Sequence, residues 1–244
     1  MERSPDPGSE APVVPPGVRA GYAVFDRVTG KTVREHRARE VFRSASVVKI
    51  LIALDHLERG GEPDPRLRAM LRSSDDAAAS ALWRRGGRGE IVERMAGRMG
   101  LVDTRPPPAD KPEFWGYTAL SAADVVVMYR YLLEEARPGH RDVVVGELRR
   151  ATRRGTDHYD QYFGIPRAVP RPWAVKQGWS GFEGGAASEE FGELGLGRPV
   201  LHTTGLVGPG ERYVMAVLTL QAAGTSFPTA AARVTELTRR LRPL

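Results

Sequence analysis

The alternation of hydrophobic and polar residues predicts strands at both ends of the chain. Residues 21–28 alternate as a strand does, Thr29 and Gly30 form a turn signal, and residues 31–37 resemble the returning strand of a hairpin. Three more strands are predicted in the last third of the chain, at residues 174–181, 200–207 and 213–220, the last two joined by a Gly-Pro-Gly turn at 208–210. Strands so separated in sequence predict one antiparallel sheet that is built from both chain ends.

Helical periodicity fills the middle of the chain. The first predicted helix runs from Ser46 to Glu58, and Gly60 and Gly61 end it. Further helices are predicted at residues 66–84, 89–99, 120–136, 141–152 and, after Pro228, to Leu241. Because strands and helices are segregated rather than alternating, the predicted fold class is α+β, an antiparallel sheet flanked by helices with a reduced all-helical lobe.

The same pattern divides the chain into regions. Residues 1–17 contain five prolines and little apolar periodicity, which predicts a disordered lead-in. Residues 18–244 are expected to form one domain. Within it we expect an α/β lobe of about residues 18–45 and 155–244 and a helical lobe of about residues 46–154.

Composition excludes several kinds of chemistry. The chain has no cysteine, so it holds no disulfide, thiolate nucleophile or cysteine-based zinc site. Basic residues outnumber acidic ones by 36 to 30, but 32 of the 36 are arginines in short clusters without interleaved aromatic residues, and we expect no nucleic-acid partner. The five histidines are scattered, and we expect no metal and no cofactor.

The sequence shows neither a membrane-spanning segment nor a signal peptide. The longest uncharged stretch, residues 213–232, is interrupted by Gln221, Gly224 and Pro228, so no membrane span is expected. Residues 1–5 lack the apolar core of a signal peptide. We expect a cytoplasmic monomer from the sequence as written, and an extracytoplasmic protein if the sequence has been trimmed.

Ser46 and Lys49 form a Ser-x-x-Lys pair at the start of the first predicted helix. Residues i and i+3 lie on one helix face, so the hydroxyl and the amine can meet. A serine hydroxyl becomes an effective nucleophile when a base takes its proton, and a desolvated lysine can be that base. An N-cap serine followed by a surface lysine is the alternative interpretation.

Two further motifs follow along the chain. A Ser-Asp-Asp sequence at residues 74–76 lies in a helical context, where serine and aspartate are also favoured helix caps. A Lys-Gln-Gly sequence at residues 176–178 lies within a predicted strand, and its glycine would let a ligand lie against the backbone. Each motif alone also fits a purely structural role.

Together and in this order, the three motifs resemble those of the serine β-lactamase and penicillin-binding-protein superfamily: Ser-x-x-Lys, Ser-x-Asn and Lys-Thr-Gly. The resemblance extends over about residues 20–244, because the hairpin, helices and later strands also fall where that superfamily has them. It implies a β-lactamase/transpeptidase-like fold and a serine that becomes acylated.

The resemblance also implies roles for individual residues. Ser46 would be the acylated nucleophile, and Lys49 would be its general base or would act through another group. Ser74 would relay a proton to the leaving group. Lys176 would bind a substrate carboxylate and tune Ser74. The backbone N–H groups of Ser46 and Trp179 would form the oxyanion hole.

Asp76, Gln177 and Gly178 complete the substrate-binding set, and two of them depart from the family motifs. Asp76 replaces the usual asparagine, and its carboxylate would favour the charged form of Lys49; alternatively, Lys176 neutralises Asp76. Gln177 replaces threonine or serine, although its amide can still donate a hydrogen bond.

The segment before the helix predicted at 120–136 contains no Glu-x-x-Leu-Asn, the motif whose glutamate activates the deacylating water in class A enzymes. Glu113 is the nearest candidate and lacks that context. The sequence therefore predicts an enzyme, an active-site-serine hydrolase that forms an acyl-serine from an amide or ester and is a poor β-lactamase. The expected substrate is a small molecule or peptide with a carboxylate.

Two alternatives stay open. One is an acyltransferase that uses the same site with an amine acceptor. The other is a catalytically weak homologue that binds a muropeptide or a β-lactam.

Overall fold

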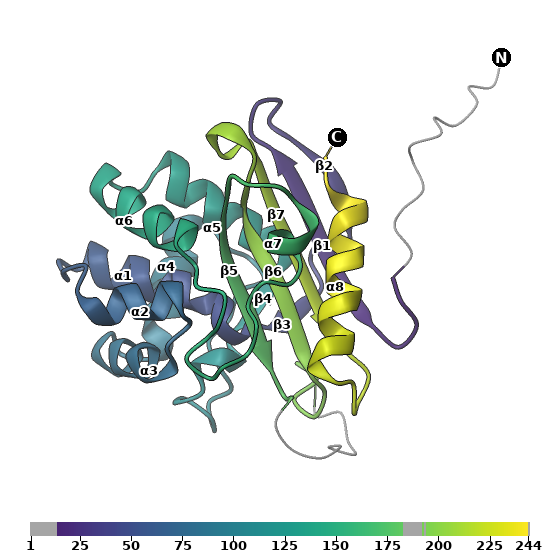
Figure 1. The fold of residues 1–244 in the computed structure, drawn as a ribbon. Helices are drawn as coiled ribbons and strands as arrows, with labels where there is room; N and C mark the ends of the chain where they lie inside the picture. The colour runs from purple at the N-terminus through teal and green to yellow at the C-terminus, as the bar shows by residue number, and fades with distance from the viewer. Residues whose placement is uncertain (1–13, 183–191, 193, 244) are drawn as a thin grey trace.

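The computed structural model describes residues 14–182, 192 and 194–243, so most of the predicted lead-in lies outside the described residues. Five strands form one antiparallel sheet in the order β2-β1-β7-β6-β5 (Figure 1). They are β1 (Arg19–Asp26), β2 (Lys31–His36), β5 (Trp173–Ser180), β6 (Val200–Val207) and β7 (Tyr213–Leu220). Because β1 pairs with β7 along its whole length, the two chain ends share the sheet, as predicted.

Helices lie on both sides of this sheet (Figure 1). One side carries α1 (Lys49–Glu58), α2 (Pro65–Arg72), α3 (Asp76–Arg85), α4 (Gly89–Met99), α5 (Ala122–Glu134) and α6 (Pro138–Arg149). The closing helix α8 (Phe227–Leu241), yellow in Figure 1, packs on the other side with the short α7 (Ile165–Ala168). The predicted α+β fold class is confirmed, whereas the division into lobes stays a prediction.

Both faces of the sheet are buried. Successive residues of a strand point to opposite faces. Phe25 of β1 accordingly belongs to the core shared with α1 and α5, and its neighbour Val24 belongs to the core shared with Leu237 of α8. Strand β7 is therefore apolar on both sides and reads as a nearly continuous hydrophobic run, whereas β6 is equally buried but carries His202, Thr203 and Thr204 in its middle.

The structure differs from the predicted elements at three places near the site. The helix predicted at 66–84 is interrupted, because Ser74 adopts a left-handed φ of 58° and Asp75 caps α3 by accepting a hydrogen bond from the N–H of Ala78. Strands β3 (Val41–Arg43) and β4 (Ala119–Ser121) pair with each other and are too short to show alternation. Ser46 lies in a 3₁₀ turn, η1 (Ala45–Val48), just ahead of α1.

A buried carboxylate ties α2 to α6. Glu147 is 1% exposed, and its carboxylate accepts hydrogen bonds from Arg68 Nη1 at 2.7 Å and from Arg72. Because α2 leads directly into residues 73–75, this ion pair fixes the position of the loop that carries Ser74.

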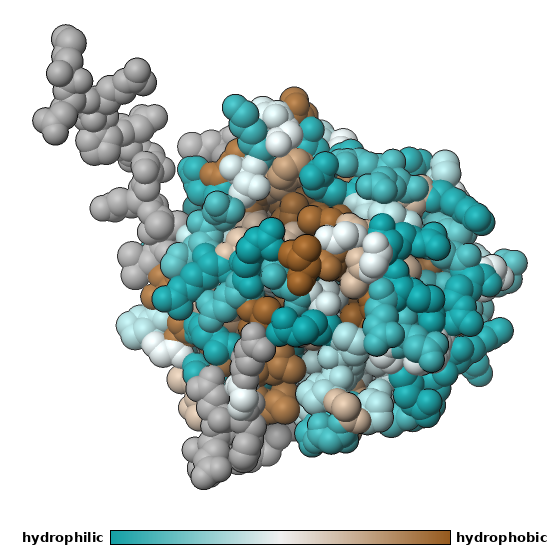
Figure 2. Space-filling model, turned by 180° about the vertical axis from the view of Figure 1, so that it is seen from behind, coloured by the Kyte–Doolittle hydropathy of each residue, from teal (hydrophilic) through white to brown (hydrophobic). Residues whose placement is uncertain are grey.

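The outer surface seen from behind is mostly hydrophilic on the side of these helices (Figure 2). No helix in the described part of the chain combines the length and the apolar character that a membrane crossing needs.

Candidate active site

Ser46 lies at the junction of β3 and α1. The preceding residue, Ala45, has a φ of 44°, an unfavourable angle for a residue with a Cβ, and such strain is concentrated at functional sites. Ser46 is 4% exposed and lines a cavity of about 460 Å³. Lys49 follows one turn later and is completely buried.

Two lysines converge on one hydroxyl. Lys49 Nζ lies 3.1 Å from Ser74 Oγ and donates a 2.7 Å hydrogen bond to the Ser74 carbonyl oxygen. Lys176 Nζ of β5 lies 2.9 Å from the same Ser74 Oγ and 3.2 Å from the carbonyl oxygen of Gln177. Residues from the three motifs thus meet, although Ser74 and Lys176 are 102 positions apart.

The surroundings of Lys49 affect its charge in opposite directions. Burial lowers the pKa of Lys49, while the carboxylate of Asp76, 2.5 Å from Nζ, raises it; burial is the larger effect. The ammonium also lies 4.6 Å from the centre of the Trp115 ring, a favourable cation–π position. Asp76 therefore pairs with Lys49 and not with Lys176.

Lys176 is the more strongly perturbed lysine. Burial, followed by the nearby charge of Lys49, lowers the pKa of Lys176 well below its usual value. A lysine in this position loses its proton at lower pH than a surface lysine does.

Strand β5 passes close to η1 at Gly178. A Cβ at position 178 would lie 3.0 Å from the carbonyl oxygen of Ser44 and 3.3 Å from the backbone nitrogen of Ser46, so any larger residue would crowd this approach. The next residue, Trp179, lines the cavity with Ser46. Gln177 is directed elsewhere: its buried amide donates to the carbonyl oxygens of residues 161 and 163 and is not part of the cavity lining.

Three carboxylates line the cavity, those of Asp76, Glu113 and Asp157. Glu113 forms ion pairs with Arg84 and Arg88, and the hydrogen bond from Arg88 is the main cause of a lowered pKa of Glu113. A carboxylate with a lowered pKa is a weaker base.

Aromatic residues form the remaining wall of the cavity. They are Phe114, Trp115, Tyr117 and Trp179. Trp179 Nε1 donates a 2.7 Å hydrogen bond to Asp157, and Trp115 Nε1 donates to Ser80. Sequence reasoning missed Trp115 and Asp157; the run of aromatics at 114–117 was a possible signal for the first, and no local pattern marks the second.

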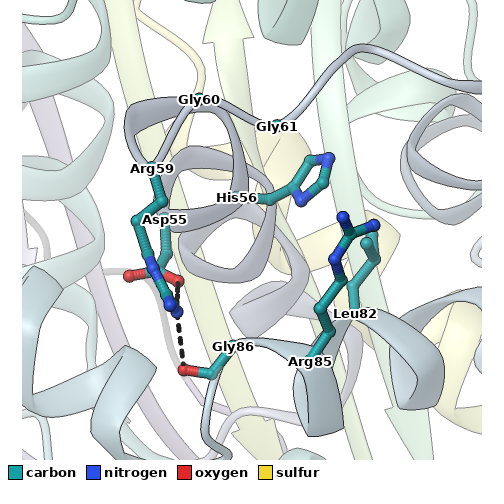
Figure 3. A pocket seen from close by; sticks show the side chains of 8 residues that line it. All are labelled: Asp55, His56, Arg59, Gly60, Gly61, Leu82, Arg85 and Gly86. Carbon is teal, nitrogen blue, oxygen red and sulfur yellow. Dashed lines mark hydrogen bonds and ion pairs between the residues drawn. The ribbon is translucent and has the colours of Figure 1, made fainter.

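A second cavity of about 250 Å³ lies where α1 and α3 end, far along both helices from Ser46 (Figure 3). Arg59 lies on one side, and His56 and Arg85 lie on the other. Basic side chains at helix C-termini stabilise the helix dipole, and Asp55, which also lines this cavity, is bound by Arg94. We attribute these charges to stability of the helices.

No group of three or more histidine, aspartate or glutamate residues within residues 14–182, 192 and 194–243 is arranged to hold a metal ion.

Comparison with known proteins relates this arrangement to one family. The sequence matches the family described as "Beta-lactamase enzyme family" over residues 66–242. It is 35% identical over 240 residues to the putative lipoprotein LppW of Mycobacterium tuberculosis and of Mycobacterium bovis, covering 93% of this chain and 70% of the relative.

Solved structures share the fold at lower sequence identity. An ancestral class A β-lactamase superposes with a TM-score of 0.69 at 19% identity, covering 92% of this chain and 94% of the other. A class A β-lactamase from Mycobacterium abscessus gives 0.68 at 23% identity, covering 92% and 93%. A PBP-A variant, solved as an acyl-enzyme complex with penicillin G, gives 0.68 at 16% identity, covering 93% and 89%.

The relatives correct one expectation. They are named lipoproteins, which indicates an extracytoplasmic location and contradicts the expected cytoplasmic one. The expectation rested on the composition of residues 1–5 and on the lack of an apolar stretch long enough to span a membrane.

Proposed function

Because the chain belongs to the beta-lactamase enzyme family, we propose that it is an active-site-serine hydrolase that acts outside the cytoplasm on small-molecule amides or esters. The observation that carries the proposal is the convergence of two buried lysines on Ser74 Oγ, one of which, Lys49, lies one helical turn after Ser46. This arrangement supplies a nucleophile, a base and a proton relay within one desolvated site.

The proposed reaction begins when Ser46 Oγ attacks the carbonyl carbon and its proton passes to neutral Lys49. The 3.1 Å contact between Lys49 Nζ and Ser74 Oγ supports transfer of that proton through Ser74 to the leaving group as the carbonyl–leaving-group bond breaks. The acyl group then remains on Ser46. We propose the backbone N–H groups of Ser46 and Trp179 as the oxyanion hole, which the close approach of β5 to η1 at Gly178 supports.

For Lys176 we propose the tuning of Ser74. Its Nζ is buried and bound to Ser74 Oγ and to a carbonyl oxygen, and Lys176 is not among the residues that line the cavity. These contacts support an influence on the relay hydroxyl more than direct contact with a substrate carboxylate.

We propose that the acyl-serine persists. Deacylation needs a base that activates water. Glu113 is the glutamate nearest to where class A enzymes carry the Glu-x-x-Leu-Asn motif, and it is bound by two arginines that lower its pKa. A penicillin should therefore form a lasting adduct on Ser46 and should not be turned over rapidly.

A second candidate function is binding without turnover. The 2.5 Å ion pair between Lys49 and Asp76 favours it, because a protonated Lys49 cannot accept the proton of Ser46. In that case the cavity would bind its ligand without forming a covalent bond between Ser46 and the ligand.

Intact mass spectrometry after incubation with a fluorophosphonate and, separately, with a penicillin separates these functions. We expect a covalent adduct that Ser46→Ala abolishes while the melting temperature stays within about 2 °C, because the removed hydroxyl has no packing role as large as a core side chain. Adducts on Ser44 or Ser74 would contradict the assignment of the nucleophile. Rapid hydrolysis of penicillin without a detectable adduct would contradict slow deacylation, and the absence of any adduct would favour the binding protein.

A further inference from the structure

Building on the proposed function, we infer that this site selects substrates carrying a positively charged group, with Asp157 as the residue that determines this specificity. The cavity beside Ser46 is lined by three carboxylates and four aromatic rings. No lysine or arginine among the residues that the structure describes lines it. The charged groups of the lining are thus carboxylates, and the basic residues that pair with two of them lie outside the lining.

The two lysines of the site lie behind this wall. Lys49 is 0% exposed and Lys176 is 1% exposed, and both donate to Ser74. The charge of Lys49 is further bound by Asp76 at 2.5 Å. Neither ammonium is available to form a direct ion pair with an anionic ligand in the cavity.

Asp157 differs from the other two carboxylates of the cavity. Asp76 pairs with Lys49, and Glu113 pairs with Arg84 and Arg88. Asp157 is exposed and forms no ion pair with any described residue; its carboxylate accepts hydrogen bonds from Trp179 Nε1 at 2.7 Å and from the N–H of Tyr159 at 3.3 Å. Asp157 acts on the two buried lysines only through space, raising the pKa of both, so its carboxylate stays open to direct contact with a ligand, and the indole hydrogen bond fixes it at the cavity wall.

The aromatic residues suit the same kind of ligand. Phe114 is 54% exposed and stacks on Tyr117 with ring centres 5.1 Å apart, so this pair presents an apolar surface to the cavity. Trp179 adds an indole next to Asp157. The faces of aromatic rings attract cations, and aromatic residues beside a carboxylate are well suited to bind alkylated ammonium groups.

The preferred substrate class is consequently an ester or amide whose acyl group ends in an ammonium group, and a sulfonate in place of that ammonium is disfavoured. The test uses three 4-nitrophenyl esters that share one leaving group. Their acyl groups are 4-(trimethylammonio)butanoyl, its uncharged isostere 5,5-dimethylhexanoyl, and the anionic 4-sulfobutanoyl. The rate of acylation of Ser46, followed by nitrophenolate release and intact mass, is divided by the spontaneous hydrolysis rate of each ester.

We expect the cationic ester to react about tenfold faster than its isostere, equivalent to ~1.4 kcal/mol, and the anionic ester to be slowest. Asp157→Asn keeps an acceptor for the Trp179 indole and should reduce this ratio to about twofold or less. Asp142→Asn, which removes a 70% exposed carboxylate on α6, is the matched control and should leave the ratio unchanged.

A wild-type ratio of one or less, or an unchanged ratio in Asp157→Asn, would overturn the inference. Acylation of Ser46 by all three esters without a charge preference would leave the proposed hydrolase function standing. If no ester acylates Ser46, the proposed function fails, and the substrate class inferred from it fails as well.

Discussion

Removal of the Asp76 charge should make the protein a faster acylating enzyme at neutral pH. The Asp76 carboxylate lies 2.5 Å from Lys49 Nζ and raises the pKa of Lys49, in opposition to burial, which lowers it. Asp76→Asn removes the opposing effect and keeps an oxygen that can accept the hydrogen bond. The pKa of Lys49 must then fall, and a larger fraction of Lys49 is the neutral base at pH 7.

The size of this effect follows from the geometry. Two unit charges 2.5 Å apart interact by ~1.7 kcal/mol at the dielectric constant of water. The Asp76 side chain is 67% exposed, so solvent screens the pair and the value for water is the appropriate choice. At 1.36 kcal/mol per pH unit, the rising limb of the acylation rate should move to lower pH by about one unit.

The assay is the rate of fluorophosphonate labelling of Ser46 between about pH 6 and pH 10, because this probe carries no carboxylate. Asp75→Asn is the matched control. Asp75 is the adjacent carboxylate, caps α3 through Ala78 N–H, and has the smallest effect among the three aspartates that raise the pKa of Lys49. Asparagine caps a helix as well as aspartate does, so this control should leave the profile almost unmoved.

Superposed profiles for the wild type and Asp76→Asn would refute the reasoning, because they would mean that Asp76 positions side chains without setting the basicity of Lys49. A shift to higher pH would refute it more directly. Equal shifts in Asp76→Asn and Asp75→Asn would show that net charge, and not the ion pair, controls the rate.

Three further predictions concern the framework of the site. Gly178→Ala should slow labelling of Ser46 by about tenfold or more, because the added Cβ pushes β5 away from η1. Its circular dichroism spectrum should stay native, and an unchanged labelling rate would contradict the close approach. Glu147→Gln should lower the urea-derived free energy of unfolding by ~2 kcal/mol, since it leaves three arginines, Arg68, Arg72 and Arg150, without their buried counter-ion; a change below ~0.5 kcal/mol would show that the ion pairs are not needed. Burial lowers the pKa of His202 to about 4, below the unfolded value of ~6.5, so the unfolded state binds more protons in this window. The stability contributed by His202 should thus be present above pH 6.5 and fall by ~3 kcal/mol as the pH drops to 4. Urea titrations, which give the free energy of unfolding at each pH, should show this loss in the wild type and not in His202→Gln.

Local patterns allowed much of the fold to be predicted. Strands β6 and β7 begin and end at the predicted residues, because the Gly-Pro-Gly turn at 208–210 separates two segments that are buried along almost their whole length. The separation of Ser46 and Lys49 by one helical turn also follows from sequence, since i and i+3 neighbours are fixed by backbone geometry alone. The break at residues 73–75 did not follow, because the left-handed conformation of Ser74 depends on the packing of α2 and α3 against their neighbours.

The sequence by itself determined the order of the three motifs, the α+β class and the identity of the side chains available for chemistry. Only the tertiary structure decided how their charges are paired. It assigned Asp76 to Lys49, turned Gln177 away from the cavity, and brought Asp157 to its wall with no ion pair to any residue that the structure describes. These outcomes could not be predicted from local patterns, because burial and through-space contacts between β5, α1 and α3 set both the partner and the pKa of each charged group.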